Sequence, residues 1–400
     1  MAGPLAGMRV LECAQIMAGP TCGALLADLG ADVIKVEKIP GGDDARAYRE
    51  PRVGGVSAPF LVMNRNKRGI ALDFKHPAGR DALLRLVDSA DVLVENYRPG
   101  TMDKLGLGWE ALHARRPGLI YCSISGYGLT GPLGGGGGFD LVAQAFAGLM
   151  SITGEPDRPP AKVGSSVADL NAGLLAANGI LAAYVHRLKT GEGQRVDTSL
   201  MEAALHQTGW HASVWFATGA SPGPLGSGHV LAAPYQAFRT RDRWIVIGGA
   251  NQANWERICD VLGRPDWKGD VRFVDNSARM ANLPALVDAM EAVLGGRDAA
   301  DWLAAFEAAG VPAGPVNSIG DALSHPQTLA RGMVVELEHP VAGTTRALGT
   351  PITLSATPAR IDRHAPSLGE HTREVLREHG WTDAEIDALL ASGAALQAPA

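Results

Sequence analysis

The sequence is poor in residues that bind zinc or cross-link small secreted domains. Of its four cysteines, no two form a C-x-x-C pair, so we predict neither a zinc site nor a disulfide framework. His206 and His211 lie five residues apart, which is not the i, i+4 spacing of a helical metal pair, and we expect no bound metal. Scattered cysteines of this kind indicate buried thiols in a reducing compartment; they are Cys13, Cys22, Cys122 and Cys259.

The sequence also lacks a net positive charge and long apolar runs. The net charge is −6, which gives no electrostatic reason to bind nucleic acid or an anionic membrane surface. The chain opens without a basic segment followed by an apolar one, and it contains no run of about 18 uninterrupted apolar residues. We therefore expect a cytoplasmic protein with no nucleic-acid partner and no membrane partner.

The motifs of several common enzyme sites are missing as well. There is no Walker P-loop and no G-x-S-x-G nucleophile elbow between a predicted strand and a helix, so neither ATP-driven chemistry nor serine hydrolysis is indicated. The turn after the first predicted strand reads AGPTCG over Ala18–Gly23 instead of G-x-G-x-x-G. Glu37 stands where a ribose ligand is expected, but without the glycine motif an NAD-dependent dehydrogenase is disfavoured.

What the first half of the chain does contain is a regular alternation of strand and helix patterns. Strands separated by helices predict a mostly parallel sheet with helices on both of its faces. The predicted strands are Met8–Cys13, Asp32–Glu37, Gly69–Phe74, Val92–Glu95, Leu119–Ser123 and Gln194–Leu200.

The length of 400 residues favours two domains. We predict an α/β fold in which a large Rossmann-like domain spans residues 1–217 and is completed by residues 326–400. A run rich in glycine, serine and proline at 218–233 is interpreted as a linker. It leads to a smaller α+β domain at 234–325.

Cationic and amide side chains follow several of the predicted strands. Parallel strands end at one edge of a sheet, where ligands of such folds bind. Several cations at that edge suit a ligand that carries several phosphates. The residues concerned are Lys38, Lys75, Asn96, Arg98 and Lys104.

Five consecutive glycines, Gly134–Gly138, follow the last strand of the first half. Such a run forms either a flexible surface connection or a mobile segment of an active site. Both interpretations remain open on composition alone.

Asp169 is the only charged side chain between Lys162 and His186, and a long predicted helix begins beside it. As a helix N-cap, its carboxylate would accept the unpaired N–H groups of the first turn. As a nucleophile, it would be a desolvated carboxylate that the helix dipole keeps ionised. Apolar residues at helical spacing predict one buried face for this helix; they occupy positions 170, 174, 177, 181, 184, 185 and 188.

Several segments in fixed order resemble the class III CoA-transferases, the formyl-CoA transferase and carnitine-CoA transferase type. The resemblance covers essentially the whole chain and implies that Asp169 is the catalytic nucleophile. The segments are Gly7–Glu37, Asn66–Arg68, Ile70–Lys75, Asp91–Gly100, Ala168–Asp169 and Pro234–Phe238.

The resemblance also implies which positions contact coenzyme A. Two of them depart from the family pattern: relatives often carry a basic residue where this chain has Gln15, and some have arginine at Lys104. The implied positions are Gln15, Ala18, Lys38, Leu72, Lys75, Asn96, Tyr97 and Lys104.

The activity implied by the resemblance is the transfer of CoA from an acyl-CoA, such as succinyl-CoA, to a small carboxylic or dicarboxylic acid. Asp169 would carry the CoA as an aspartyl thioester, with no tightly bound cofactor, in an interlocked homodimer. A carboxylate with a pKa near 4 is ionised at neutral pH and needs no general base.

Two other functions stay open. An α-methylacyl-CoA racemase of the same superfamily needs a histidine as a second acid–base group, where this chain has Phe139 between Gly138 and Asp140. A CoA-binding protein without catalysis is the other alternative, although the nucleophile position is intact.

Overall fold

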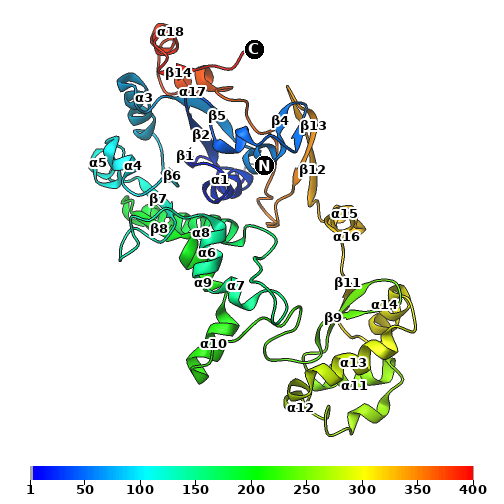
Figure 1. The fold of residues 1–400 in the computed structure, drawn as a ribbon. Coiled ribbons are helices and arrows are strands. Elements are labelled where there is room, and N and C mark those ends of the chain that lie inside the picture. The colour runs from blue at the N-terminus through cyan, green and yellow to red at the C-terminus, as the bar shows by residue number, and fades with distance from the viewer. Residues whose placement is uncertain (1–2, 400) are drawn as a thin grey trace. The chain divides into compact units, whose positions relative to one another are not determined.

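The computed structural model describes residues 3–399, which contain a seven-stranded sheet of order β14-β5-β2-β1-β6-β7-β8 (Figure 1). Six of these strands, β5, β2, β1, β6, β7 and β8, run parallel to one another. The seventh, β14, pairs antiparallel with β5 at one edge. The predicted mostly parallel sheet is confirmed. Its strands are β1 (Arg9–Cys13), β2 (Asp32–Lys38), β5 (Arg68–Leu72), β6 (Val92–Glu95), β7 (Ile120–Ser125), β8 (Arg195–Ser199) and β14 (Ala395–Leu396).

Helices cover both faces of this sheet, which is why its strands are nearly continuous apolar runs. On one face, Leu11, Ile34 and Leu93 pack with α3, α17 and α18 in a single buried cluster. On the other face, α8 packs against α1 and contacts β7 and β8. The helices of this part of the chain are α1 (Ala18–Asp28), α2 (Ala58–Asn64), α3 (Pro77–Val87), α4 (Thr101–Lys104), α5 (Trp109–Arg115), α6 (Asp140–Phe146), α8 (Val167–Thr190), α9 (Leu200–His206), α16 (Pro326–Ala330), α17 (Thr372–Glu378) and α18 (Asp383–Ala391).

Smaller elements complete this part of the chain. A short 3₁₀ helix, η1, follows β2, and two antiparallel hairpins lie outside the main sheet. These elements are η1 (Asp44–Ala47), β3 (Arg52–Val53), β4 (Val56–Ser57), β12 (Val334–His339) and β13 (Gly343–Leu348).

The strand order reverses between β1 and β6. Strands β2 and β5 lie on one side of β1, whereas β6, β7 and β8 follow on the other. The loops after β1 and β6 therefore lead away in opposite directions, and such a point is where ligands bind in open α/β sheets. Two hydrogen bonds of 2.9 Å join the loops there: Gln15 N donates to Asn96 Oδ1, and Asn96 Nδ2 donates to Gln15 O.

Helix α8 does not bury the face that its apolar spacing predicts. Leu174, Val185 and Leu188 are exposed, while a row of mainly alanine and glycine is buried. The reason is the close approach of α1, because a Cβ atom on Gly173 would lie 2.6 Å from the carbonyl oxygen of Ala18. Only small side chains fit at such a distance, so the larger ones point away from the sheet.

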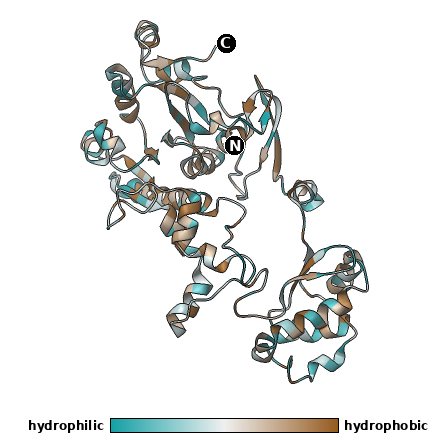
Figure 2. Ribbon diagram, viewed as in Figure 1, coloured by the Kyte–Doolittle hydropathy of each residue, from teal (hydrophilic) through white to brown (hydrophobic). Residues whose placement is uncertain are grey.

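By length and composition, α8 is also the one helix within residues 3–399 that could cross a membrane, with a mean hydropathy of 1.2 over 18 residues. Hydrophobic residues along it are visible in Figure 2. Its contacts with α1, α9, β7 and β8 are those of a core helix beside a sheet.

The chain divides into two compact units, and the division differs in part from the predicted one. The sheet-containing unit comprises the chain up to Ala147, Val163–Gln207, and the chain from Pro326 onward. Residues 148–162 and 208–217, which we placed in the large domain, belong with 218–325 in the second unit. One reason is a backbone hydrogen bond from Gly226 N to Gly154 O, which connects residues 148–162 to the predicted linker at 218–233.

The second unit has its own core around a three-stranded antiparallel sheet of order β11-β10-β9. Trp255, Trp267 and Phe273 are buried in that core and contact one another. Its elements are α7 (Leu149–Ile152), α10 (Gly209–Thr218), β9 (Tyr235–Arg239), β10 (Trp244–Gly248), α11 (Gln252–Val261), η2 (Pro265–Lys268), α12 (Asn276–Ala281), α13 (Leu283–Leu294), α14 (Ala299–Ala308), β11 (Ala313–Pro315) and α15 (Ile319–Ser324).

Candidate active site

A cavity of about 520 Å³ lies at the carboxyl ends of β1, β6, β7 and β8, within the sheet-containing unit. Its walls come from the loop after β1, the loop after β6, the glycine run after β7 and the first turn of α8. Asp169 and three of the five consecutive glycines share this cavity. The fold therefore places the candidate nucleophile beside the reversal point of the strand order.

A second cavity, of about 530 Å³, lies at the amino ends of β2 and β5, opposite to the carboxyl ends where the first cavity lies. Arg68 lines it and is already bonded to three carboxylates, those of Asp32, Glu374 and Glu378. This cavity contains no candidate nucleophile from our sequence analysis, and we do not assign the chemistry to it.

Asp169 does not cap α8, so that interpretation of the sequence is wrong. Asp169 is the third residue of the helix, and within residues 3–399 its carboxylate accepts no hydrogen bond. The carboxylate of Asp140 fills the capping role instead, since its Oδ1 accepts from the backbone N–H groups of Ala168 (2.8 Å) and Asp169 (3.3 Å). The side chain of Asp169 is therefore left available to a ligand.

Asp140 is itself held in place by a buried glutamine of the same helix. Gln144 Nε2 donates to Asp140 Oδ2 at 2.7 Å, and Gln144 Oε1 accepts from Val163 N at 2.9 Å. These contacts connect α6 to the segment that leads into α8. They fix the position of the first turn of α8 and, with it, the backbone of Asp169.

The surroundings of Asp169 raise its pKa above the ordinary value for an aspartate. Burial is the main cause, the negative charge of Asp140 adds to it, and together they raise the pKa of Asp169 to about 6. The expectation of a pKa near 4 therefore needs correction. The carboxylate is still mostly ionised at pH 7, and its place in the first turn of a 24-residue helix favours the anion.

The glycine run faces Asp169 across the cavity. Gly136, Gly137 and Gly138 line the cavity, and a Cβ atom on Gly138 would lie 2.4 Å from the Cα atom of Gly126. Glycine is required at this approach because no side chain fits there. Within residues 3–399, the N–H groups of Gly137 and Gly138 donate no hydrogen bond, so they are free to stabilise an anion in the cavity.

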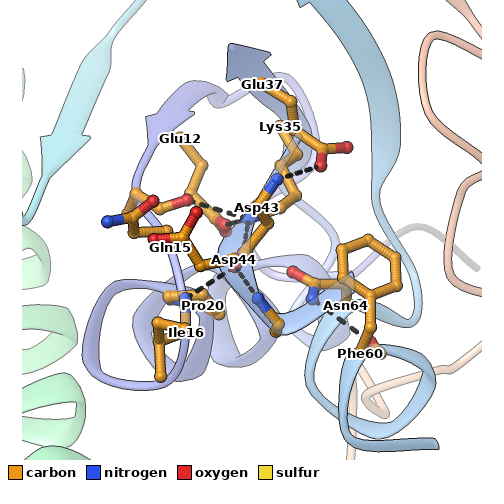
Figure 3. A network of polar contacts seen from close by, with 12 residues as sticks. Glu12, Gln15, Ile16, Pro20, Lys35, Glu37, Asp43, Asp44, Phe60 and Asn64 are labelled. Carbon is orange, nitrogen blue, oxygen red and sulfur yellow. Dashed lines mark hydrogen bonds and ion pairs between the residues drawn. The ribbon is translucent and has the colours of Figure 1, made fainter. Parts of the chain in front are cut away.

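Beneath the loop after β1 lies a fully buried cluster of charges, part of which is drawn in Figure 3. Lys35 Nζ lies 3.0 Å from Glu12 Oε1 and 2.8 Å from Asp43 Oδ2, and Lys67 Nζ lies 2.7 Å from Glu12 Oε2. Burial opposes the charge of Lys35, but Glu12 and Asp43 outweigh it and raise the pKa of Lys35. For Lys67 burial prevails and lowers the pKa to about 8.

This cluster holds the loop that lines the cavity. Lys35 Nζ donates to the carbonyl of Ala14 at 2.9 Å, and Asp43 Oδ1 accepts from Ile16 N at 2.9 Å (Figure 3). Ile16 has a φ of +66°, a left-handed conformation that is unfavourable for a β-branched residue. The buried charges therefore position a strained loop against the candidate site.

The predicted CoA positions separate into two groups. Gln15, Ala18, Asn96, Tyr97 and Arg98 line the cavity with Asp169. The second group does not line it and comprises Lys38, Leu72, Lys75 and Lys104.

The three lysines of the second group are exposed. Lys38 is the last residue of β2, Lys75 follows the carboxyl end of β5, and Lys104 lies in α4 after β6. They extend along the same edge of the sheet, although Lys38 is paired with Asp44 at 2.5 Å. Leu72 is fully buried, so its side chain offers no surface to a ligand.

Sequence reasoning missed the capping role of Asp140 and the whole buried charge cluster. Asp140 lies 29 residues before Asp169, and no local pattern connects the two. The cluster left a weak signal, because Glu12 and Lys35 are charged residues that lie between apolar neighbours within the two strands.

Comparison with known proteins gives a family match over most of the chain. Residues 5–372 match the model of CoA-transferase family III. The chain is 39% identical to a succinate–glutarate CoA-transferase of Agrobacterium fabrum, over 94% of this chain and 95% of that protein. It is 38% identical to an acetyl-CoA:oxalate CoA-transferase of Acetobacter aceti, over 96% and 97% respectively.

A solved structure shares the fold as well. The crystal structure of a CaiB/BaiF family protein from Brucella suis superposes with a TM-score of 0.85 at 39% identity, covering 95% of this chain and all of that one. The family match and these relatives identify a CoA-transferase with an α/β fold. The chain belongs to CoA-transferase family III, as the resemblance predicted.

Proposed function

We propose that the protein transfers CoA from an acyl-CoA, with succinyl-CoA as the donor, to a small carboxylic or dicarboxylic acid through a thioester on Asp169. The observation that carries the proposal is the Asp169 carboxylate, which accepts no hydrogen bond within residues 3–399 and faces a glycine-lined cavity. The relatives described above act on succinate and glutarate or on acetyl-CoA and oxalate. A thioester-exchange screen with succinyl-CoA and acetyl-CoA against a panel of acids tests it.

The proposed reaction balances without a cofactor or a net proton transfer. A carboxylate oxygen of Asp169 attacks the donor carbonyl, the C–S bond breaks, and an anhydride and CoA thiolate form. The thiolate then attacks the Asp169 carbonyl carbon and releases the donor acid as a carboxylate. The acceptor carboxylate reverses both steps and leaves as a new thioester.

Each step passes through a tetrahedral oxyanion that needs hydrogen-bond donors already in place. The N–H groups of Gly137 and Gly138, unpaired within residues 3–399, are the donors that we assign to it. Their backbone is fixed where Gly138 packs on Gly126. The same loop would also help to keep water from the anhydride.

We further propose that the edge formed by Lys38, Lys75 and Lys104 binds the phosphates of CoA. Changing Lys75→Ala, or removing the 3′-phosphate of CoA, should weaken binding at least a few-fold, because a hydrogen bond to a charged group contributes about 1.5–3 kcal/mol before solvent screening. Calorimetry checks this, with Lys189→Ala at the far end of α8 as an exposed-lysine control. Unchanged affinity in both experiments would exclude Lys75 from the site.

A homodimer is proposed for the same chain. Large apolar side chains are exposed on and next to the contacting helices α6 and α8, including Phe139, Phe146 and Leu174 at 76%, 56% and 48% exposure. An exposed patch of this kind marks an interaction surface, and a second copy of the chain is the usual partner. Light scattering should give about twice the 41.8 kDa of one chain; a mass near 41.8 kDa would contradict a dimer.

The racemase alternative gains no support from the structure. The position that needs a histidine holds Phe139, whose ring lines the cavity and cannot carry a proton. We therefore expect no exchange of the α-proton of a 2-methylacyl-CoA with deuterated solvent, as followed by NMR. Deuterium incorporation at catalytic rates would favour the racemase.

A further inference from the structure

The cavity that holds Asp169 contains a second charged group that the proposed reaction does not use. Among the described residues that line it, Arg98 is the only cation and Asp169 the only carboxylate. Within residues 3–399, the guanidinium of Arg98 forms no ion pair and donates no hydrogen bond. By contrast, Arg46 in η1 and Arg68 in β5 are each bonded to carboxylates.

The position of Arg98 separates it from the lysines of the CoA edge. A Cβ atom on Gly137 would lie 3.4 Å from Arg98 Nε and 3.5 Å from one of its terminal nitrogens. The guanidinium therefore lies against the glycine loop that lines the cavity of Asp169. Lys38, Lys75 and Lys104 do not line this cavity, so among the described residues Arg98 is the one lysine or arginine that shares it with Asp169.

A guanidinium without a protein partner in such a cavity matches a planar anion, because its parallel N–H groups bind both oxygens of a carboxylate. We propose that Arg98 binds the free carboxylate of a dicarboxylic acyl group and so selects dicarboxylic over monocarboxylic substrates. This rests on the proposed transferase function and reassigns Arg98 from the CoA phosphates to the acyl group.

The test compares two donors that differ only at the far end of the acyl chain. Succinyl-CoA ends in a carboxylate, whereas butyryl-CoA ends in a methyl group at the same distance from the thioester. In a reaction that passes through a covalent enzyme, kcat/KM for the donor reports only the first half-reaction. The choice of acceptor therefore does not affect the comparison.

Arg98→Gln should lower kcat/KM for succinyl-CoA about 10- to 100-fold and that for butyryl-CoA less than about threefold. Arg98→Lys should recover part of the loss, since it keeps the charge but not the paired N–H groups. Lys75→Ala is the matched control and should affect both donors alike. In an Asp169→Asn background, where turnover is blocked, calorimetry with the two thioesters should show the same selective loss of affinity.

Equal losses for both donors, with weaker binding of free CoA, would assign Arg98 to CoA and overturn the inference. No loss for either donor would make it an exposed bystander and overturn it as well. If the protein without any substitution transferred CoA from neither donor, that result would instead refute the proposed function. The two failures are therefore distinguishable.

Discussion

Replacing Asp169 by Asn should leave a folded protein that binds CoA but turns over about 10³-fold more slowly or worse. The side-chain amide keeps the size of the carboxylate but cannot attack a thioester. Its folding should survive because the Asp169 carboxylate accepts no hydrogen bond within residues 3–399. Steady-state assays with succinyl-CoA, together with calorimetric CoA binding, measure both parts of the prediction.

The matched control is the carboxylate that does cap the helix. Asp140→Ala should lower the free energy of unfolding by about 1 kcal/mol, because Asp140 Oδ1 accepts from two N–H groups of α8. Asp169→Ala should lower the free energy of unfolding by less than Asp140→Ala does. If Asp169 were the N-cap, the order of the two losses would be the opposite. Substantial activity in the Asp169→Asn variant, with a mass that excludes deamidation, would remove Asp169 from the mechanism.

The second large effect is expected in stability. Changing Lys35→Met should lower the free energy of unfolding by about 3–5 kcal/mol, because it leaves buried carboxylates without their counter-charge. Glu12 and Asp43 both lie within 3.0 Å of Lys35 Nζ, and all three side chains are fully buried. Urea denaturation followed by circular dichroism gives the value.

The control for that measurement is a lysine in the same strand. Lys38 pairs with Asp44 at the surface, where both side chains are about half exposed, so Lys38→Met should cost less than about 1 kcal/mol. A similar small loss for Lys35→Met would show that the buried charges do not depend on one another. A loss of more than about 1 kcal/mol for Lys38→Met would show that Lys38 contributes more to stability than a surface ion pair does.

The sheet could be predicted from the sequence because several of its parallel strands are buried along their whole length. Strands such as β6, VLVE, and β7, IYCSIS, are apolar runs with no exposed residue. Buried strands of that kind are recognisable without any knowledge of their neighbours. The position of Asp169 in the first turn of a long helix was also readable from its isolation among apolar residues.

The orientation of α8 could not be predicted in the same way. Apolar spacing shows that a helix has a face to bury, but it does not say which neighbour approaches or how closely. Here the contact of Gly173 with Ala18 of α1 selects the row of small residues, and the leucines face outward. The cap from Asp140 and the bonds of the buried charges join residues far apart in the chain, so no local pattern could reveal them.

The most direct test of the account is to trap the thioester on Asp169. The protein is incubated with succinyl-CoA, reduced with borohydride and analysed by peptide mass spectrometry. The proposed role of Asp169 predicts that the aspartyl thioester is reduced to homoserine at residue 169 alone. Homoserine should form only when the donor is present and should be absent from the Asp169→Asn variant. An active preparation in which residue 169 stays unmodified, or in which another residue carries the adduct, would contradict it.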